Sequence, residues 1–237
     1  MEKTIHVSNK GATLDTSRRN FLKLGGAGLV VAGLTLAGCR DDNFQNMDDA
    51  NNVFDLGKGD VGVLNYAYAL EQLEADFYTK VVNNFYSGIS AEERQLFTDI
   101  YHHEVIHRDF FKAALTGATT QVLPTLQFKY DGVDFNNRAS VLATAKALED
   151  TGVAAYNGAG KYITNLDYLV IAGKIVSVEA RHAAAIRNVI NPGSADFSGD
   201  DVIDVNGLDL AKEPKDIVMV AGSFIKTPFT WKEQGIS

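Results

Sequence analysis

The chain has 237 residues, of which 46% are hydrophobic and 22% are charged. This length and composition predict one globular domain with appendages rather than two full domains. Thirty acidic residues against 22 basic ones give a formal net charge of −8, which argues against a nucleic-acid partner because phosphate binding needs a basic surface.

The N-terminal residues predict an export signal rather than a part of the fold. Residues 17–23 read SRRNFLK and precede a weakly apolar, glycine-rich run at residues 24–38, LGGAGLVVAGLTLAG. This run is shorter than the roughly 20 residues of a membrane-spanning helix, and a charged region before a short apolar run is typical of a secretory signal. SRRNFLK resembles a twin-arginine signal, which implies that residues 1–38 are a signal peptide exported by the twin-arginine route.

The apolar run ends in residues 36–39, LAGC, which resemble a bacterial lipoprotein cleavage box. Cys39 is the only cysteine, so an intramolecular disulfide is excluded. The resemblance implies lipidation of Cys39 and attachment to a membrane of the cell envelope, on a face that the sequence leaves open. Residues 39–60 are polar and acidic and predict a flexible tether. Without residues 1–38, which hold five basic and two acidic residues, the net charge is −11.

Four stretches with helical spacing of apolar residues follow, at residues 61–83, 90–115, 138–157 and 164–191. We expect Ser90 with Glu93 to cap the second helix and Thr164 with Asp167 to cap the fourth. Short links join the first helix to the second and the third to the fourth, whereas residues 116–137 separate the two pairs. One long crossover between two hairpins predicts an all-α, ferritin-like four-helix bundle over residues 61–190. Residues 191–237 form a C-terminal extension with a short helix near Pro214.

Two Glu-x-x-His pairs carry the chemistry of the predicted bundle. Glu104 and His107 lie on the second helix, and Glu179 and His182 lie on the fourth. Residues three apart share a helix face, so both groups of a pair can bind one metal ion. The predicted metal ligands are completed by one inward glutamate on each of the other two helices, Glu71 and Glu149. Converging buried carboxylates are costly without cations or protons, and two divalent metals would neutralise them.

These residues resemble the ferritin-like superfamily, which includes bacterioferritin, rubrerythrin and manganese catalase. Residues 64–78, LNYAYALEQLEADFY, are similar to the first helix of its desiccation-related branch, and the resemblance covers about residues 60–190. Several members place a tyrosine seven residues after the first glutamate ligand, as Tyr78 follows Glu71, which favours Glu71 over Glu74 as the ligand.

The resemblance implies two ions of iron or manganese, a choice that imidazole and carboxylate ligands leave open. It implies that Glu71, Glu104 and His107 bind one ion. It implies that Glu149, Glu179 and His182 bind the other, with Glu104 and Glu179 as bridges.

Other polar residues near the predicted site have more ordinary interpretations. We expect Tyr78 and Tyr156 to pack beside the ligands or to donate hydrogen bonds to them. Glu74 is expected to pair with a basic side chain or to support the ligands. His102 should project away from the inner face and His103 should sit at its edge, so that both are solvated or at an interface.

The favoured function is that of a di-metal oxidoreductase, ferroxidase-like or catalase-like, that reacts with dioxygen or peroxide in the cell envelope. The alternative is a non-catalytic, stress- or desiccation-related envelope protein in which the site is structural. Iron storage in a closed shell is a weaker third hypothesis, because a lipid anchor and a long C-terminal extension fit poorly into a cage. A homodimer is compatible with the pattern.

Overall fold

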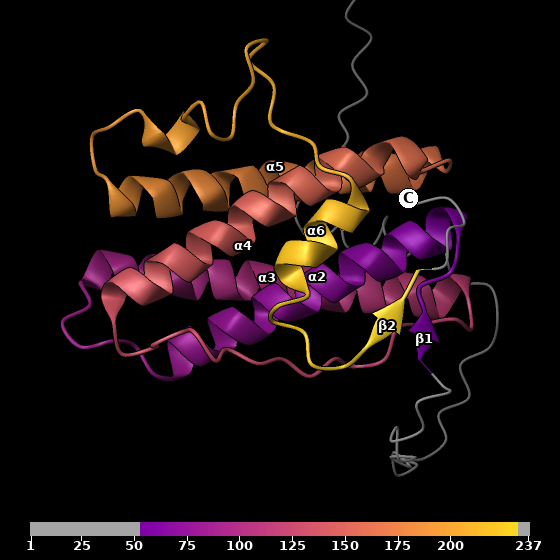
Figure 1. Ribbon diagram of the computed structural model, residues 1–237, viewed down its shortest axis with the longest axis horizontal. Coiled ribbons are helices and arrows are strands. Elements are labelled where there is room, and N and C mark those ends of the chain that lie inside the picture. The colour runs from indigo at the N-terminus through magenta and orange to yellow at the C-terminus, as the bar shows by residue number, and fades with distance from the viewer. Residues whose placement is uncertain (1–52, 232–237) are drawn as a thin grey trace, which may run out of the picture. The chain divides into compact units, whose positions relative to one another are not determined.

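The computed structural model describes residues 53–231 of the chain (Figure 1). The predicted signal peptide, the predicted lipidation site Cys39 and residues 39–52 of the predicted tether lie outside the described residues. The last eight residues of the predicted tether, 53–60, are described. Within residues 53–231, no helix is long and apolar enough to cross a membrane.

Four long helices, α2 (Gly59–Asn83), α3 (Ala91–Ala118), α4 (Arg138–Ala159) and α5 (Leu166–Ile190), make up most of the fold. The remaining elements are the strands β1 (Phe54–Asp55) and β2 (Phe229–Thr230), the short helix α6 (Pro214–Ala221), and the 3-10 turns η1 (Gly160–Tyr162) and η2 (Asp196–Ser198). The predicted all-α four-helix bundle is confirmed, and the helix boundaries lie within about three residues of those that the sequence predicts.

Side-chain caps explain where α3 and α5 begin. The Ser90 hydroxyl accepts from the Glu93 amide, as the capping box predicts. The predicted cap of α5 is wrong by one residue, because Asn165 accepts from the Asp167 amide instead. Thr164 is engaged elsewhere: its amide and its hydroxyl both donate to the carboxylate of Asp60 in the first turn of α2. The start of α5 is thereby fastened to the start of α2.

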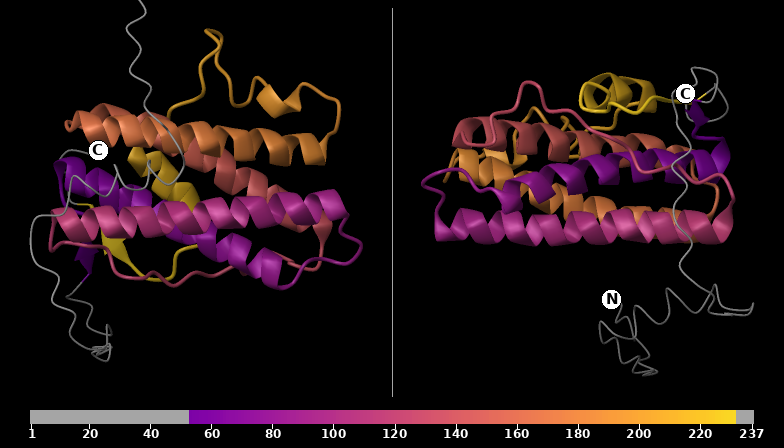
Figure 2. Two further views of the ribbon diagram at one scale, coloured as in Figure 1. Left: turned by 180° about the vertical axis from the view of Figure 1, so that it is seen from behind. Right: turned by 90° about the horizontal axis from the view of Figure 1, so that it is seen from below.

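The helices form two antiparallel hairpins, α2–α3 and α4–α5, that pack against each other. Helices α2 and α4 face the viewer in Figure 1, and α3 and α5 lie side by side in the left view of Figure 2. The apolar core lies between the four helices and includes the fully buried Phe77, Phe97, Ile100 and Ile186. Each helix therefore turns one face towards the centre of the bundle.

The crossover, residues 119–137, covers a second face of α2, away from the centre of the bundle. The buried Asn65 donates to the Gln121 carbonyl and accepts from the Leu123 amide. Gln72, also buried, accepts from the Leu126 amide and donates to the Pro124 carbonyl. These side chains replace the hydrogen bonds that an irregular segment would otherwise make with water.

The C-terminal extension returns over α4, where α6 crosses it (Figure 1). Strand β2 then pairs in parallel with β1, with Phe54 opposite Phe229. Gly158 of α4 permits the approach, because a Cβ atom there would lie 1.7 Å from the Lys212 carbonyl oxygen. The Lys212 amide also donates to the Ala154 carbonyl at 3.0 Å. The extension is thus in backbone contact with the bundle.

We expect Gly158→Ala to destabilise the fold by at least about 2 kcal/mol, because backbone rather than a flexible side chain must move to admit the methyl group. Gly173→Ala on α5 is the matched control, since a Cβ there meets no atom within 4 Å. That change should stabilise the helix by about 0.5–1 kcal/mol. Urea unfolding of both variants checks this. Equal midpoints would contradict the tight contact at Gly158.

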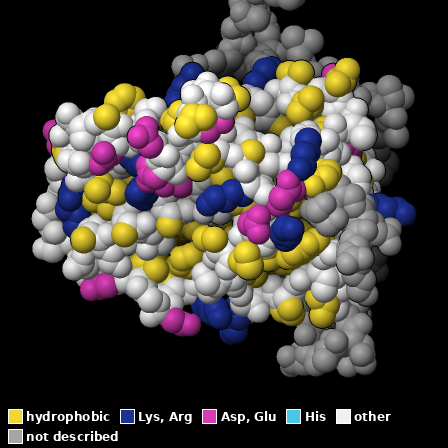
Figure 3. All heavy atoms as spheres, turned by 45° about the horizontal axis from the view of Figure 1, so that its top comes forward, with side chains coloured by type: hydrophobic (Ala, Val, Ile, Leu, Met, Phe, Trp, Pro, Cys, Tyr) yellow, Lys and Arg dark blue, Asp and Glu magenta, His cyan; other side chains and the backbone are white. Residues whose placement is uncertain are grey.

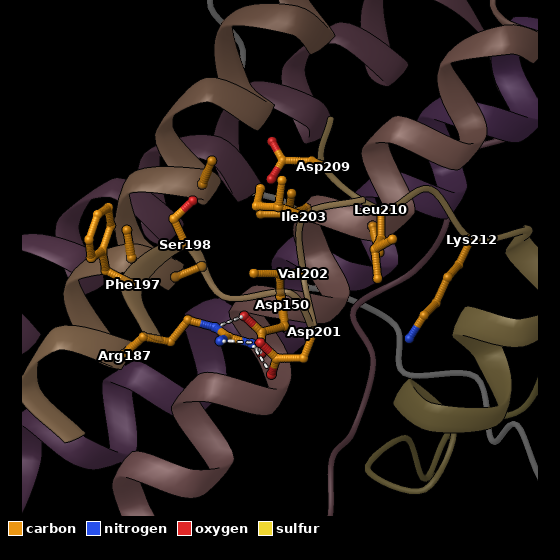
Figure 4. Close-up of a pocket in the computed structure, with 15 residues that line it drawn as sticks. Asp150, Arg187, Phe197, Ser198, Asp201, Val202, Ile203, Asp209, Leu210 and Lys212 are labelled. Atoms are coloured by element: carbon orange, nitrogen blue, oxygen red, sulfur yellow. Dashed lines mark hydrogen bonds and ion pairs between the residues drawn. The ribbon is translucent and has the colours of Figure 1, made fainter. Parts of the chain in front are cut away.

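A hollow of about 350 Å³ lies between α4, α5 and the extension (Figure 4). Arg187 lies at its edge and donates to both oxygens of Asp150 and of Asp201, as well as to the Asp196 carbonyl. All five guanidinium hydrogens are therefore used. Arg187 therefore has no donor left for a ligand in this hollow.

The face that carries the extension shows Lys and Arg side chains scattered among acidic ones (Figure 3). Charges of both signs are therefore interspersed on this face of the described residues.

Candidate metal centre

The centre of the bundle brings together the six side chains that the sequence singled out as ligands. Each of the four long helices contributes one glutamate that is 0% exposed, and α3 and α5 each add a histidine. They form two groups whose candidate ligand atoms lie within 4.8 Å of one another, Glu71, Glu104, His107 and Glu179 in the first and Glu104, Glu149, Glu179 and His182 in the second. Two glutamates, Glu104 and Glu179, belong to both groups.

In the first group, His107 turns its Nδ1 towards three carboxylates. Nδ1 lies 2.8 Å from Glu179 Oε1, 3.5 Å from Glu71 Oε2 and 3.7 Å from Glu104 Oε2. The three carboxylates come from three different helices. Ordinary helix periodicity brings them to one point, because each residue lies on the inward face of its own helix.

The second group has nearly the same arrangement around His182. Its Nδ1 lies 2.9 Å from Glu104 Oε1, 3.4 Å from Glu149 Oε2 and 3.5 Å from Glu179 Oε2. Glu104 and Glu179 thus turn one oxygen to each histidine. Two carboxylates shared in this way can bridge a pair of ions.

These contacts have the distances of ion pairs but not the geometry of hydrogen bonds. Eight buried atoms of the two groups have no hydrogen-bond partner: Oε2 of Glu71 and Glu149, both carboxylate oxygens of Glu104 and Glu179, and Nδ1 of His107 and His182. An unsatisfied buried polar atom normally costs about 1–3 kcal/mol, so eight of them at one place require an explanation. Their lone pairs converge on common points, and the donor set of carboxylate and imidazole fits divalent iron or manganese. The residues present therefore fit a metal pair.

Burial and mutual repulsion shift the pKa values of three of the four convergent carboxylates towards the neutral form. Burial raises the pKa of Glu71, Glu104 and Glu149 above the usual carboxyl value, and the neighbouring Glu179 raises each of them further. Burial opposes ionisation of Glu179 too, but its contacts with His107 and His182 outweigh burial and lower its pKa.

The two histidines compensate in part for the carboxylates. Burial disfavours their charged form, yet the surrounding carboxylates raise the pKa of both His107 and His182 well above the usual imidazole value. In the metal-free site, protons on the histidines therefore offset part of the negative charge. Metal ions could take over this role, and their binding would then release the protons.

Two tyrosines hold the outer oxygens of the unshared glutamates. Tyr78 of α2 donates to Glu149 Oε1 on α4 at 2.5 Å, and Tyr156 of α4 donates to Glu71 Oε1 on α2. Each tyrosine stands seven residues after the glutamate of its own helix and bonds the glutamate of the other. The crossed hydrogen bonds leave Oε2 of each glutamate directed at the cluster. The spacing of Tyr78 from Glu71 predicted a place beside the site, and Tyr156 has the same spacing from Glu149.

Glu74 is buried beside the cluster but belongs to neither group. Of its two expected roles, the pairing with a basic side chain is wrong, because no Lys, Arg or His within residues 53–231 forms an ion pair with it. Support of the ligands stays a prediction. Burial, and then the charges of Glu104, Glu179, Glu149 and Glu71, raise its pKa well above the usual value. The raised pKa favours the protonated form of the Glu74 carboxyl.

Gly152 on α4 makes room for the Glu74 side chain, since a Cβ atom at Gly152 would lie 3.0 Å from Glu74 Oε1. The two residues occupy the same position in their helices, three residues after Glu71 and Glu149 respectively. The site is thus nearly symmetric in its six convergent side chains and asymmetric at this position.

We expect Glu74→Gln to leave the metal affinity within about threefold of the parent, because an amide replaces a protonated carboxyl at nearly the same size. Glu71→Gln is the matched control and should weaken binding by at least about tenfold, because it replaces an anionic oxygen donor by a neutral amide in the first group. Titration of the metal-free proteins with Mn²⁺ measures both. A Glu74→Gln variant as weak as Glu71→Gln would contradict the protonated state of Glu74.

His103 has a partner that the sequence did not reveal. Although it is exposed, its Nδ1 lies 2.8 Å from Nε2 of His182, and the two rings lie edge to edge with centroids 5.1 Å apart and planes 10° from parallel. His102 is exposed, as expected. The pairing of His103 could not be read from the sequence, because it depends on which helix lies beside α3.

A comparison with protein families agrees with this geometry. The sequence model of a family described as a ferritin-like domain matches residues 59–192. This range contains all four long helices and all six convergent residues. No curated protein matches the chain.

Proposed function

Because the chain belongs to the ferritin-like domain family, we propose that the six convergent side chains hold two divalent ions of iron or manganese, and that the protein is an oxidoreductase acting on dioxygen or peroxide. The observation that carries the proposal is the set of eight buried carboxylate and imidazole atoms without a hydrogen-bond partner. Bound metals would supply electrons to, or take them from, an oxygen substrate.

The charges of the site support a pair of divalent ions. Four carboxylates, Glu71, Glu104, Glu149 and Glu179, balance the four positive charges of two such ions when both histidines are neutral. Glu71 with His107 would serve one ion, Glu149 with His182 the other, and Glu104 with Glu179 both. Tyr78 and Tyr156 would keep the terminal carboxylates oriented, and the protonated Glu74 would hold a proton next to the site.

A structural role is the second candidate function. Its support is the position of the site at the centre of the bundle, where ligands from all four long helices meet. Ions bound there would link the two hairpins whether or not a substrate reacts. Catalase and ferroxidase assays of the metal-loaded protein separate the candidates, because turnover supports the oxidoreductase and its absence supports the structural role.

Element analysis of protein purified from its native host tests the metal site itself. The expected result is two iron or manganese atoms per chain. Fewer than one atom per chain after reconstitution with either metal would overturn the proposal. Native export matters because loading in a foreign host can insert the wrong metal.

We also propose that Cys39 anchors the protein to a membrane of the cell envelope. Its support is the sequence of residues 17–39, which lie outside the described part of the chain. In cells fed a labelled fatty acid, we expect the parent protein to carry label in the membrane fraction. Cys39→Ala should lose the label and release the protein. Unlabelled parent protein in the soluble fraction would contradict the anchor.

A further inference from the structure

The two histidines of the candidate metal centre differ in what their outer nitrogens contact. Both turn Nδ1 towards the carboxylates. Nε2 of His182 lies 2.8 Å from Nδ1 of His103, whereas Nε2 of His107 has no hydrogen-bond partner within residues 53–231. The near symmetry of the six convergent residues therefore does not extend to the groups that orient them.

The difference is encoded directly before each Glu-x-x-His pair. His103 precedes Glu104 on α3, and Val178 precedes Glu179 on α5. Helices α3 and α5 lie side by side (Figure 2), so the residue at this position on one helix can approach the histidine of the other. Only α3 provides a side chain there that can accept a hydrogen bond.

A metal ion at His182 Nδ1 requires that this nitrogen carry no proton. The proton of the neutral ring is then on Nε2, which donates to Nδ1 of His103. Nδ1 of a neutral His103 is unprotonated in this arrangement, and its own proton lies on Nε2. The contact thus holds His182 in the tautomer that binds metal. Because a ring N–H donates in the plane of its ring, the contact also orients the His182 ring, whose plane lies 10° from that of His103.

We propose that His103 is a positioning residue that makes the His182 subsite the tighter of two unequal divalent-cation subsites. The inference rests on the proposed metal pair and adds an order of filling: the subsite of Glu149 and His182 fills before that of Glu71 and His107. A hydrogen bond to the outer nitrogen makes imidazole a better metal donor and removes the cost of orienting its ring. Loss of such a partner typically weakens metal binding about 10–100-fold.

The test is a calorimetric titration of the metal-free protein with Mn²⁺. The parent should show two classes of site, one ion in each. His103→Leu, which removes the acceptor, should weaken the tight class about 10–100-fold and leave the weak class within about threefold. His103→Asn, whose amide oxygen can stand near the position of Nδ1, should restore most of the loss. Val178→Leu is the matched control at the equivalent position of α5 and should change neither class.

A second measurement follows the hydrogen bond itself. In the Co²⁺-loaded parent, proton NMR should show a shifted, slowly exchanging N–H signal from His182. This signal should broaden into solvent exchange in His103→Leu and return in His103→Asn. A merely structural effect of His103 would change the thermal midpoint without this pattern of loss and return.

The outcomes separate the inference from the proposed function. A parent that takes up no metal overturns both. A parent that binds two ions while His103→Leu leaves both classes unchanged, or weakens both equally, overturns only the role of His103. His103 is exposed, so His103→Leu should fold, and circular dichroism verifies this before titration.

Discussion

Glu104→Ala and Glu179→Ala are each expected to abolish tight binding at both metal positions, because these two carboxylates belong to both groups. Glu71→Ala should weaken only the first position and Glu149→Ala only the second. The expected loss at an affected position is at least about 100-fold, beyond the roughly tenfold to hundredfold cost of removing an outer hydrogen-bond partner. Metal retained per chain after dialysis, measured by element analysis, distinguishes the four variants.

Glu92→Ala is the matched control, because Glu92 lies in the first turn of α3 and is exposed. It should retain both ions. A Glu71→Ala variant that loses both ions as completely as Glu104→Ala would contradict the division into two groups with shared bridges. Each variant also removes a buried carboxyl, so a fold check by circular dichroism belongs with each measurement.

The metal-free protein is expected to lose stability as the pH rises from about 5 to 8. In the folded state the pKa values of Glu71, Glu104 and Glu149 lie above the ordinary 4.5, and those of His107 and His182 lie above the ordinary 6.5. A group with a raised folded pKa contributes stability that is fully present below its unfolded pKa and is lost as the pH rises through its folded pKa. In this window the folded protein binds more protons than the unfolded chain, so raising the pH favours unfolding.

Each extra proton held by the folded state lowers the free energy of unfolding by about 1.4 kcal/mol per pH unit. Above pH 7 the two histidines alone contribute two such protons, since they stay protonated when folded and are mostly neutral when unfolded. Glu179 has the opposite sign, because its depressed pKa gives stability above pH 4.5 that is lost as the pH falls. It therefore adds nothing to the decline between pH 5 and 8.

Saturating metal should reverse this dependence. Binding requires neutral imidazoles and ionised carboxylates, so protons are released and the apparent metal affinity rises with pH. At free metal 1,000 times the dissociation constant, one site adds about 4 kcal/mol to the free energy of unfolding. Urea unfolding at pH 5.5, 6.5 and 7.5, with chelator or with Mn²⁺, measures both trends. A metal-free protein that is most stable at pH 7.5 would contradict the buried protons.

Much of the candidate site could be predicted because its information is local. Glu104 with His107 and Glu179 with His182 are three residues apart, and helix geometry alone puts each pair on one face. The inward positions of Glu71 and Glu149 follow from the apolar residues around them in the same way. The long crossover after α3 could be read from the spacing of the helices. These features depend on residues within one helix or on the length of a link.

Contacts between helices could not be predicted from the residue spacing within each helix. The spacing of Tyr78 from Glu71 indicated a role near the site, but not that its hydroxyl would reach Glu149 on α4. Gln72 is a polar residue of α2 that the crossover buries, through contacts with residues more than 50 positions later in the chain. The cap of α5 was misplaced because Asp60, more than 100 residues away in sequence, binds Thr164.

By itself, the sequence determined the four amphipathic helices, their order and the six inward side chains, since a period of 3.6 residues decides which side chains share a face. Only the tertiary structure decided how the faces meet. It placed Gly152, which has no side chain, beside the Glu74 carboxyl. It let each tyrosine of α2 and α4 donate to the glutamate of the other helix. It also brought Nδ1 of His103 to Nε2 of His182. The physical reason is that these contacts depend on the rotation and offset of one helix against another, which packing of the whole bundle sets.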